Sequence, residues 1–158
     1  MMTGRYAQDT HVPSDRSRAE IERTLTRYGA TSFGYMSHAA EAVIVFEIAA
    51  RRVMFRIAMP DRQAREFTRT PGKGLLRSPA AADEAYEQGV RQRWRALALV
   101  IKAKLEAVQA GITSVEQEFL AHIVLPDGKT TVGTWMAPQL AAAYEGNTMP
   151  ALMPGVTR

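Results

Sequence analysis

Residues 42–59 read AVIVFEIAARRVMFRIAM, and this stretch decides the fold. In its second half apolar and polar side chains alternate. One face of this segment therefore carries Val53, Phe55, Ile57 and Met59. Alternation with a period of two is typical of a half-buried strand. The first half, Ala42–Ala49, is rich in the β-branched residues that strands favour, and Thr31–Met36 precedes it as a third strand-like segment. The short spacings between the three segments predict an antiparallel meander.

Two longer helical segments flank these strands. The first is predicted to begin at a capping box, Ser17–Glu20, because a Ser hydroxyl and a Glu carboxylate at this spacing satisfy free amides. It carries an apolar stripe at Ile21, Leu25 and Tyr28. The second begins at Ser78, an N-cap residue followed by proline, and is predicted over residues 79–110. Its continuous apolar stripe makes it the expected central helix of the core.

Shorter elements follow the long helix. A capping box at Thr113–Glu116 predicts a short helix, and residues 135–144 read as another, although Pro138 confines it. The predicted fold class is α+β: a three-stranded antiparallel meander packed against a long central helix, with additional short helices. Residues 17–146 are expected to form a single domain, between a flexible N-terminal tail over residues 1–16 and an irregular C-terminal tail over residues 147–158.

Composition narrows the class of protein. A chain of 158 residues corresponds to about one domain. It has no cysteine, which excludes disulfides, thiolate zinc sites and cysteine nucleophiles. The N-terminus has no apolar segment of the signal-peptide type, and no apolar run approaches the ~18 residues of a membrane span. We therefore expect a cytoplasmic protein with no membrane partner.

Motifs for common chemistry are absent from the sequence. Gly72–Gly74 lacks the full phosphate-binding loop pattern, and His11, His38 and His122 stand at no metal-ligand spacing. Asp127-Gly128 fits a turn better than a nuclease motif, which needs a further carboxylate before the lysine. No nucleophile elbow of the G-x-S-x-G type is present. We predict no catalytic residue, no metal and no cofactor.

The basic residues are the feature of the sequence that indicates a function. Residues 51–77 hold eight basic side chains against two acids, and residues 91–104 hold five and no acid. Arginine suits phosphate recognition because its planar fork donates two parallel hydrogen bonds. The candidate site lies on the third strand, the following loop and one strip of the long helix, with Phe67 as a base-stacking aromatic; its residues are Arg52, Arg56, Arg62, Arg65, Phe67, Arg69, Lys73, Arg77, Arg91, Arg95 and Lys102.

A competing interpretation accounts for the same residues without a ligand. An arginine-rich surface can simply be solvated, with the cations of the long helix paired to nearby acids such as Glu87 and Glu106. Both interpretations stay open at the level of sequence. Trp94 and Trp135 are expected to serve as core or interface anchors.

Four segments also carry a resemblance: residues 18–30, 93–97, 102–108 and 119–128. Together they resemble a family of small proteins encoded in bacteriophage and prophage genomes, and the likeness spans most of the chain. This family has no assigned activity, so the resemblance implies no catalytic or binding residue. It implies only a context, which is an accessory protein acting in the bacterial host cell in DNA metabolism or against host defence.

The functional hypothesis is a non-enzymatic nucleic-acid-binding accessory protein that contacts the phosphate backbone, with single strands slightly favoured because no helix-turn-helix signature is evident. The alternative is a protein-interaction module, either an inhibitor of a host defence enzyme or a self-assembling structural protein. The expected partners are accordingly a nucleic acid, a host or phage protein, or further copies of the chain.

Overall fold

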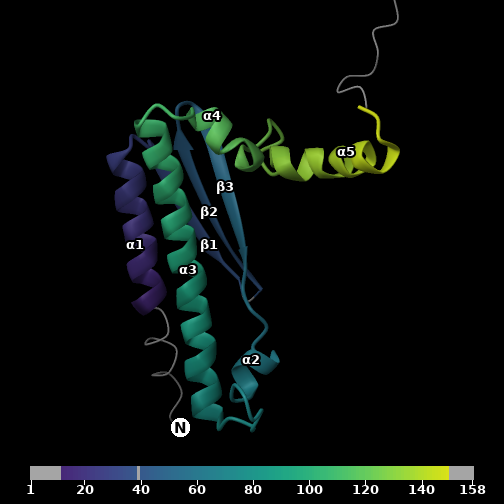
Figure 1. Cartoon of the computed structure of the whole chain (residues 1–158). Helices are drawn as coiled ribbons and strands as arrows, with labels where there is room; N and C mark the ends of the chain where they lie inside the picture. The colour runs from purple at the N-terminus through teal and green to yellow at the C-terminus, as the bar shows by residue number, and fades with distance from the viewer. Residues whose placement is uncertain (1–11, 39, 150–158) are drawn as a thin grey trace, which may run out of the picture.

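The computed structural model describes residues 12–38 and 40–149 (Figure 1). It confirms the predicted α+β class, with a three-stranded antiparallel sheet, one long helix and several shorter ones. Of the predicted tails, residues 1–11 and 150–158 lie outside the described residues. No helix in the described part of the chain is both long and apolar enough to cross a bilayer.

The sheet is the predicted meander. Its strands, in the order β1-β2-β3, are Ser32–Ser37, Glu41–Ile48 and Arg51–Ala58. Val53 pairs with Phe46 and Phe55 with Ile44, so the apolar side chains of neighbouring strands share one face. The β2–β3 turn consists of Ala49 and Ala50, both with positive φ (50° and 59°), which is the mirror-image turn that suits the twist of a two-residue hairpin.

Two helices, α1 (Val12–Arg27) and α3 (Pro79–Gln109), lie side by side and cover one face of this sheet (Figure 1). The apolar face of the strands and the stripes of both helices form one core, whose largest fully buried side chains are Trp94, Phe46, Phe119, Ile21, Leu25, Ile44, Ile101, Leu105 and Val53. The opposite face of the sheet carries no helix in Figure 1.

The start of α1 differs from the prediction. The helix begins at Val12 rather than at Ser17, so residues 12–16 are helical. Pro13 stands in the first turn, where a backbone N–H would have no partner within the helix, so proline costs no hydrogen bond there. Asp15 supplies the negative charge that a helix N-terminus favours. Ser17 is therefore an interior helical residue.

The prediction for α3 is confirmed at both ends. The Ser78 hydroxyl accepts a hydrogen bond from the backbone N–H of Ala81 at 3.2 Å, as an N-cap does, and Gly111 follows the helix with φ of 74°. With 31 residues, α3 is about 46 Å long at the usual rise per residue. Its first part extends past the end of the sheet (Figure 1).

The short elements are shifted from their predicted places. The loop over residues 61–79 contains a one-turn helix, α2 (Arg65–Thr68). The capping box after α3 uses Ser114 and Gln117, one residue later than predicted, and opens α4 (Val115–Glu118). The 3-10 turn η1 (Leu120–His122) follows.

The last helix, α5 (Val132–Gly146), includes the predicted residues 135–144 and continues through Pro138. Before it, Ile123 and Val124 make isolated bridges to Val53 and Thr131, and the chain between Val124 and Thr131 forms the turn predicted at Asp127-Gly128.

Phe119 joins this C-terminal part to the core. It has no exposed surface, and its ring meets those of Phe46 and Phe55 edge-on, with ring centres 5.7 and 6.2 Å apart. Its sequence neighbour Leu120 is half exposed. One aromatic side chain therefore fixes the chain that leaves α3 onto the buried face of the sheet.

Candidate functional site

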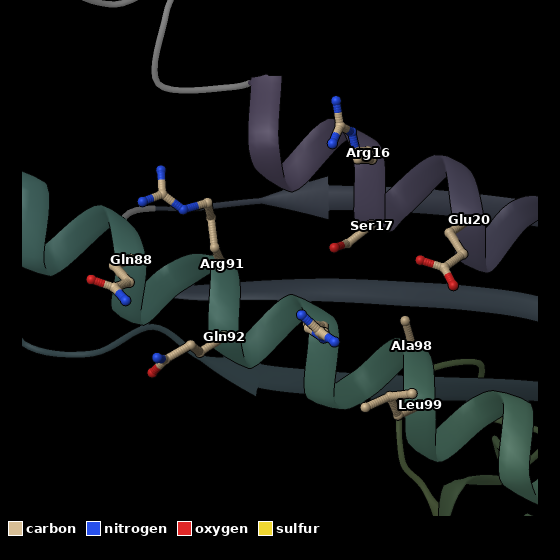
Figure 2. A pocket seen from close by; sticks show the side chains of 9 residues that line it. Arg16, Ser17, Glu20, Gln88, Arg91, Gln92, Ala98 and Leu99 are labelled. Atoms are coloured by element: carbon tan, nitrogen blue, oxygen red, sulfur yellow. The ribbon is translucent and has the colours of Figure 1, made fainter.

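A surface groove of about 650 Å³ lies between α1 and α3. In Figure 2, Arg16, Ser17 and Glu20 come from α1, and Gln88, Arg91 and Gln92 come from successive turns of α3. The full lining is Arg16, Ser17, Glu20, Gln88, Arg91, Gln92, Arg95, Ala98 and Leu99. The two helices pack side by side, so their polar side chains project from neighbouring backbones.

The groove is cationic. Three guanidinium groups, those of Arg16, Arg91 and Arg95, face one carboxylate, that of Glu20. Arg91 lies 3.3 Å from Glu84, whose side chain is largely exposed, and such surface pairs neutralise little. Arg16 and Arg95 pair with no carboxylate among residues 12–38 and 40–149. An excess of positive charge therefore remains for an anionic ligand.

A second groove, of about 580 Å³, follows the other side of α3. It contains two further cations, Arg77 and Arg93, and one acid, Glu66. Gln88 and Gln92 line both grooves and form the ridge between them. Amide side chains carry both donors and acceptors, so this ridge can bond phosphate, sugar or base edges without adding charge.

The cations of the second groove are held by neutral backbone oxygens. Arg93 donates to the carbonyl of Ala58 at 2.9 Å, and the Nε–H of Arg77 donates to the carbonyl of Arg69 at 3.1 Å. A carbonyl oxygen orients a guanidinium without cancelling its charge. The remaining N–H donors of both side chains stay free for an anion.

Most arginines of the loop over residues 61–79 make contacts within that loop or with the start of α3. Arg62 pairs with Asp83 at 2.6 Å and lies over the Tyr86 ring, while Arg69 donates to the carbonyl of Gly74 at 3.0 Å. The Arg65 guanidinium lies against Gly74, where an added Cβ would be 2.7 Å from Nη2. Of the predicted loop residues, Phe67 and Arg77 line the second groove, whereas Arg62, Arg65, Arg69 and Lys73 line neither groove.

Phe67 is not available for base stacking in this structure. Only 6% of its surface is exposed, its ring meets that of Tyr86 edge-on at 5.5 Å, and it packs against Gly89 of α3. Tyr35 is likewise covered, because the guanidinium of Arg18 lies 4.4 Å from its ring centre. The grooves therefore present guanidinium and amide groups rather than aromatic faces.

Arg52 and Arg56 lie on the other face of the sheet, away from α1 and α3. Each pairs with a glutamate of β2 at 3.0 Å, Arg52 with Glu47 and Arg56 with Glu41. For these two residues the competing interpretation of a paired, solvated surface describes the structure. They are not brought together with Arg91 and Arg95.

On α3, the predicted strip of Arg91, Arg95 and Lys102 is exposed or half-exposed, and the first two line the groove. Of the acids expected to pair with this strip, Glu106 is bonded elsewhere, whereas Glu87 lies close enough to Arg91 for the two charges to interact. Glu106 accepts a hydrogen bond from the Tyr28 hydroxyl at 2.5 Å, which raises the pKa of Tyr28, and burial raises the pKa of Glu87.

The groove residues with cationic or amide side chains that are absent from the predicted site are Arg16, Gln88, Gln92 and Arg93. Arg16 falls in the predicted tail, because the capping box at Ser17 places the start of α1 too late. The glutamines carry no charge and therefore no signal in a search for cations. Their spacing from Arg91 and Arg95 on one helix would have revealed them.

Asp127 and His122 are the other titratable residues with a shifted pKa in the described part of the chain. No group of three or more histidine or acidic side chains there could hold a metal ion. Asp127 closes its turn by accepting from the backbone N–H of Lys129 and from the N–H and hydroxyl of Thr130, which lowers its pKa to about 2. Burial, followed by the charge of Lys104, lowers the pKa of His122.

Comparison with known proteins gives no match: no family model fits this sequence, and neither a curated protein nor a solved structure is significantly similar to it. The two grooves are therefore the features of the molecule that indicate its function.

Proposed function

We propose that this protein is a non-enzymatic nucleic-acid-binding accessory protein that holds the phosphate backbone in the two grooves beside α3. The phage context implied by the sequence resemblance is part of the same proposal. The observation that carries it is that Arg16 of α1 and Arg91 and Arg95 of α3 line one open groove. Arg77 and Arg93 extend this cationic surface across the glutamine ridge.

The chemistry of the lining suits phosphate. Each guanidinium can form two parallel hydrogen bonds to phosphate oxygens, and each neutralised phosphate releases condensed counterions. Because no exposed aromatic side chain lines either groove, base stacking contributes little. We expect affinity that depends steeply on salt and weakly on sequence.

Single strands suit this surface better than duplexes. A flexible strand can enter one groove, cross the ridge at Gln88 and Gln92, and enter the other groove. Duplex DNA has a persistence length of about 50 nm, so over one protein it is a rod that touches a single ridge or groove. A strand therefore reaches more of the guanidinium groups at once.

The test compares two double variants of equal charge by fluorescence anisotropy with labelled single-stranded DNA, duplex DNA and RNA. Arg91→Gln with Arg95→Gln removes two groove cations, and Arg52→Gln with Arg56→Gln removes two cations from the opposite face of the sheet. We expect the groove variant to bind at least about tenfold more weakly and to lower the log–log salt slope by about 0.7 for each phosphate that it no longer neutralises. The control should bind within about twofold of the unmodified protein.

Equal losses of affinity in the two variants would show that net charge, and not the groove, attracts the ligand. An unmodified protein that binds no nucleic acid at low salt would refute the proposal altogether. Circular dichroism of both variants checks that the fold is retained.

A further inference from the structure

The helix α5 projects from the body of the protein as an arm (Figure 1). Its contacts are concentrated at η1, where Gly133 lies against the backbone of Ala121, and none of its side chains is buried. Its apolar residues are left in solvent: Leu140 is 57% exposed and Tyr144 82% exposed, and Trp135 is half exposed. We call residues 132–146 the α5 arm.

The α5 arm has the composition of a buried helix. Its only charged residue is Glu145, and apolar side chains occur all round its axis. A helix that is hydrophobic all round is normally enclosed by other structure. A 15-residue helix with no ion pairs of its own is also marginal in water, and Pro138 removes one of its hydrogen bonds. Such an arm needs a covering surface.

A second apolar surface of the chain is also exposed. On the solvent side of α3, Leu99 and Val100 stand out between Ala96 and Ala103, and all four residues are exposed. We call these four residues the α3 outer face. Further towards the N-terminus the same side of α3 is already used for packing, because Phe67 of α2 lies on Gly89.

We infer that the α5 arm of one copy packs on the α3 outer face of a second copy. The two surfaces match in charge: the arm carries one acid, Glu145, and the negative end of a helix dipole, whereas exposed Arg95 and Lys102 flank the α3 outer face. The arm is about 22 Å long and the α3 outer face spans about 10 Å from Ala96 to Ala103, so part of the arm is enough to cover that face.

This contact joins two different surfaces. Each copy therefore places its own α5 arm on another copy and accepts an arm on its own α3 outer face. Stable interfaces bury about 800 Å² per partner, and two helix-on-helix contacts per copy reach that range more readily than one. Leu99 also lines the end of the groove between α1 and α3. A docked arm therefore lies beside that groove and leaves Arg16 and Arg91 open.

The first test is the mass in solution, measured by light scattering after size exclusion, with nuclease treatment and high salt to remove nucleic acid. We expect a mass that is a multiple of 17.5 kDa at protein concentrations up to about 100 µM. At these concentrations any association with a Kd below about 100 µM is visible. Tyr144→Glu should reduce the mass to that of one chain. Leu76→Glu changes an equally exposed apolar residue outside both surfaces and should keep the multiple.

The second test uses the absence of native cysteine. Leu140→Cys and Val100→Cys are made in separate chains, mixed and oxidised; a disulfide forms only where the Cα atoms come within about 7 Å. We expect covalent dimers in the mixture and none in either variant alone. This test does not depend on how Tyr144→Glu affects the fold.

Three results would overturn the inference. The first is a single-chain mass for the unmodified protein at all concentrations. The second is an unchanged multiple in Tyr144→Glu. The third is a Leu140→Cys variant that links to itself rather than to Val100→Cys, which would mean that two arms pair with each other. These results concern the arm contact alone, whereas nucleic-acid binding is tested by the anisotropy of the groove variant; the two proposals share Arg95.

Discussion

Phe119 provides the sharpest test of how the core is assembled. Its ring is completely buried and touches Phe46 and Phe55 edge-on. Truncating a buried Phe to Ala costs about 3–5 kcal/mol, and here the cost includes two edge-on ring pairs worth about 0.5–1.5 kcal/mol each. We therefore expect Phe119→Ala to cost about 4 kcal/mol. This is a large share of the about 5–15 kcal/mol by which domains are stable.

Urea denaturation followed by fluorescence measures this cost. In a Trp135→Phe background, the buried Trp94 is the single tryptophan and reports unfolding of the core. With a slope of about 2 kcal/mol per molar urea, a destabilisation of about 4 kcal/mol lowers the midpoint by about 2 M. Leu120→Ala is the matched control, because the next side chain is half exposed and should cost about 1 kcal/mol or less. A cost for Phe119→Ala below about 1.5 kcal/mol, or equal to that of the control, would refute this account of the core.

Three further predictions concern local features. Replacing Ala49-Ala50 by Asn-Gly should raise stability by about 1–2 kcal/mol in thermal unfolding, because both positions have positive φ, which L-residues with a Cβ disfavour; a lower melting temperature would contradict the turn. His122 has a lowered pKa when folded, so the unfolded chain takes up the proton more readily and stability should fall as the pH drops below about 6.5; in His122→Gln this part of the pH profile should flatten, and an unchanged profile would assign the effect elsewhere. Ser78→Ala should cost about 1 kcal/mol through loss of the α3 N-cap, whereas Ser78→Asp should retain most of that stability by urea denaturation.

The sequence predicted the parts of the fold that depend on periodicity. The alternation in Arg52–Met59 and the long stripe of α3 are strong signals because each repeats over several turns or residue pairs. Short elements were less predictable. Ser114 rather than Thr113 caps α4, and because both residues carry a hydroxyl, the sequence alone does not select between them.

The candidate site was less predictable than the fold, because a set of cations does not say which face each one occupies. Arg52 and Arg91 are both basic residues on regular elements, yet one lies on the far face of the sheet with Glu47 and the other lines the groove. Arg69 and Arg77 bond to backbone carbonyls only a short way along the chain. Such local hydrogen bonds form only when the loop folds and leave no trace in composition.

The first part of α3, which extends past the sheet, opens more easily than the rest of the protein. From Trp94 onwards the helix is buried against the sheet, whereas before Val90 it is held by Phe67, Tyr86 and the pair between Arg62 and Asp83. The first part of α3 and the loop over residues 61–78 can therefore open without unfolding the core, and a protease should cut there first. Because Arg77 and Gln88 line the second groove only while this part is closed, a bound strand would slow that cleavage.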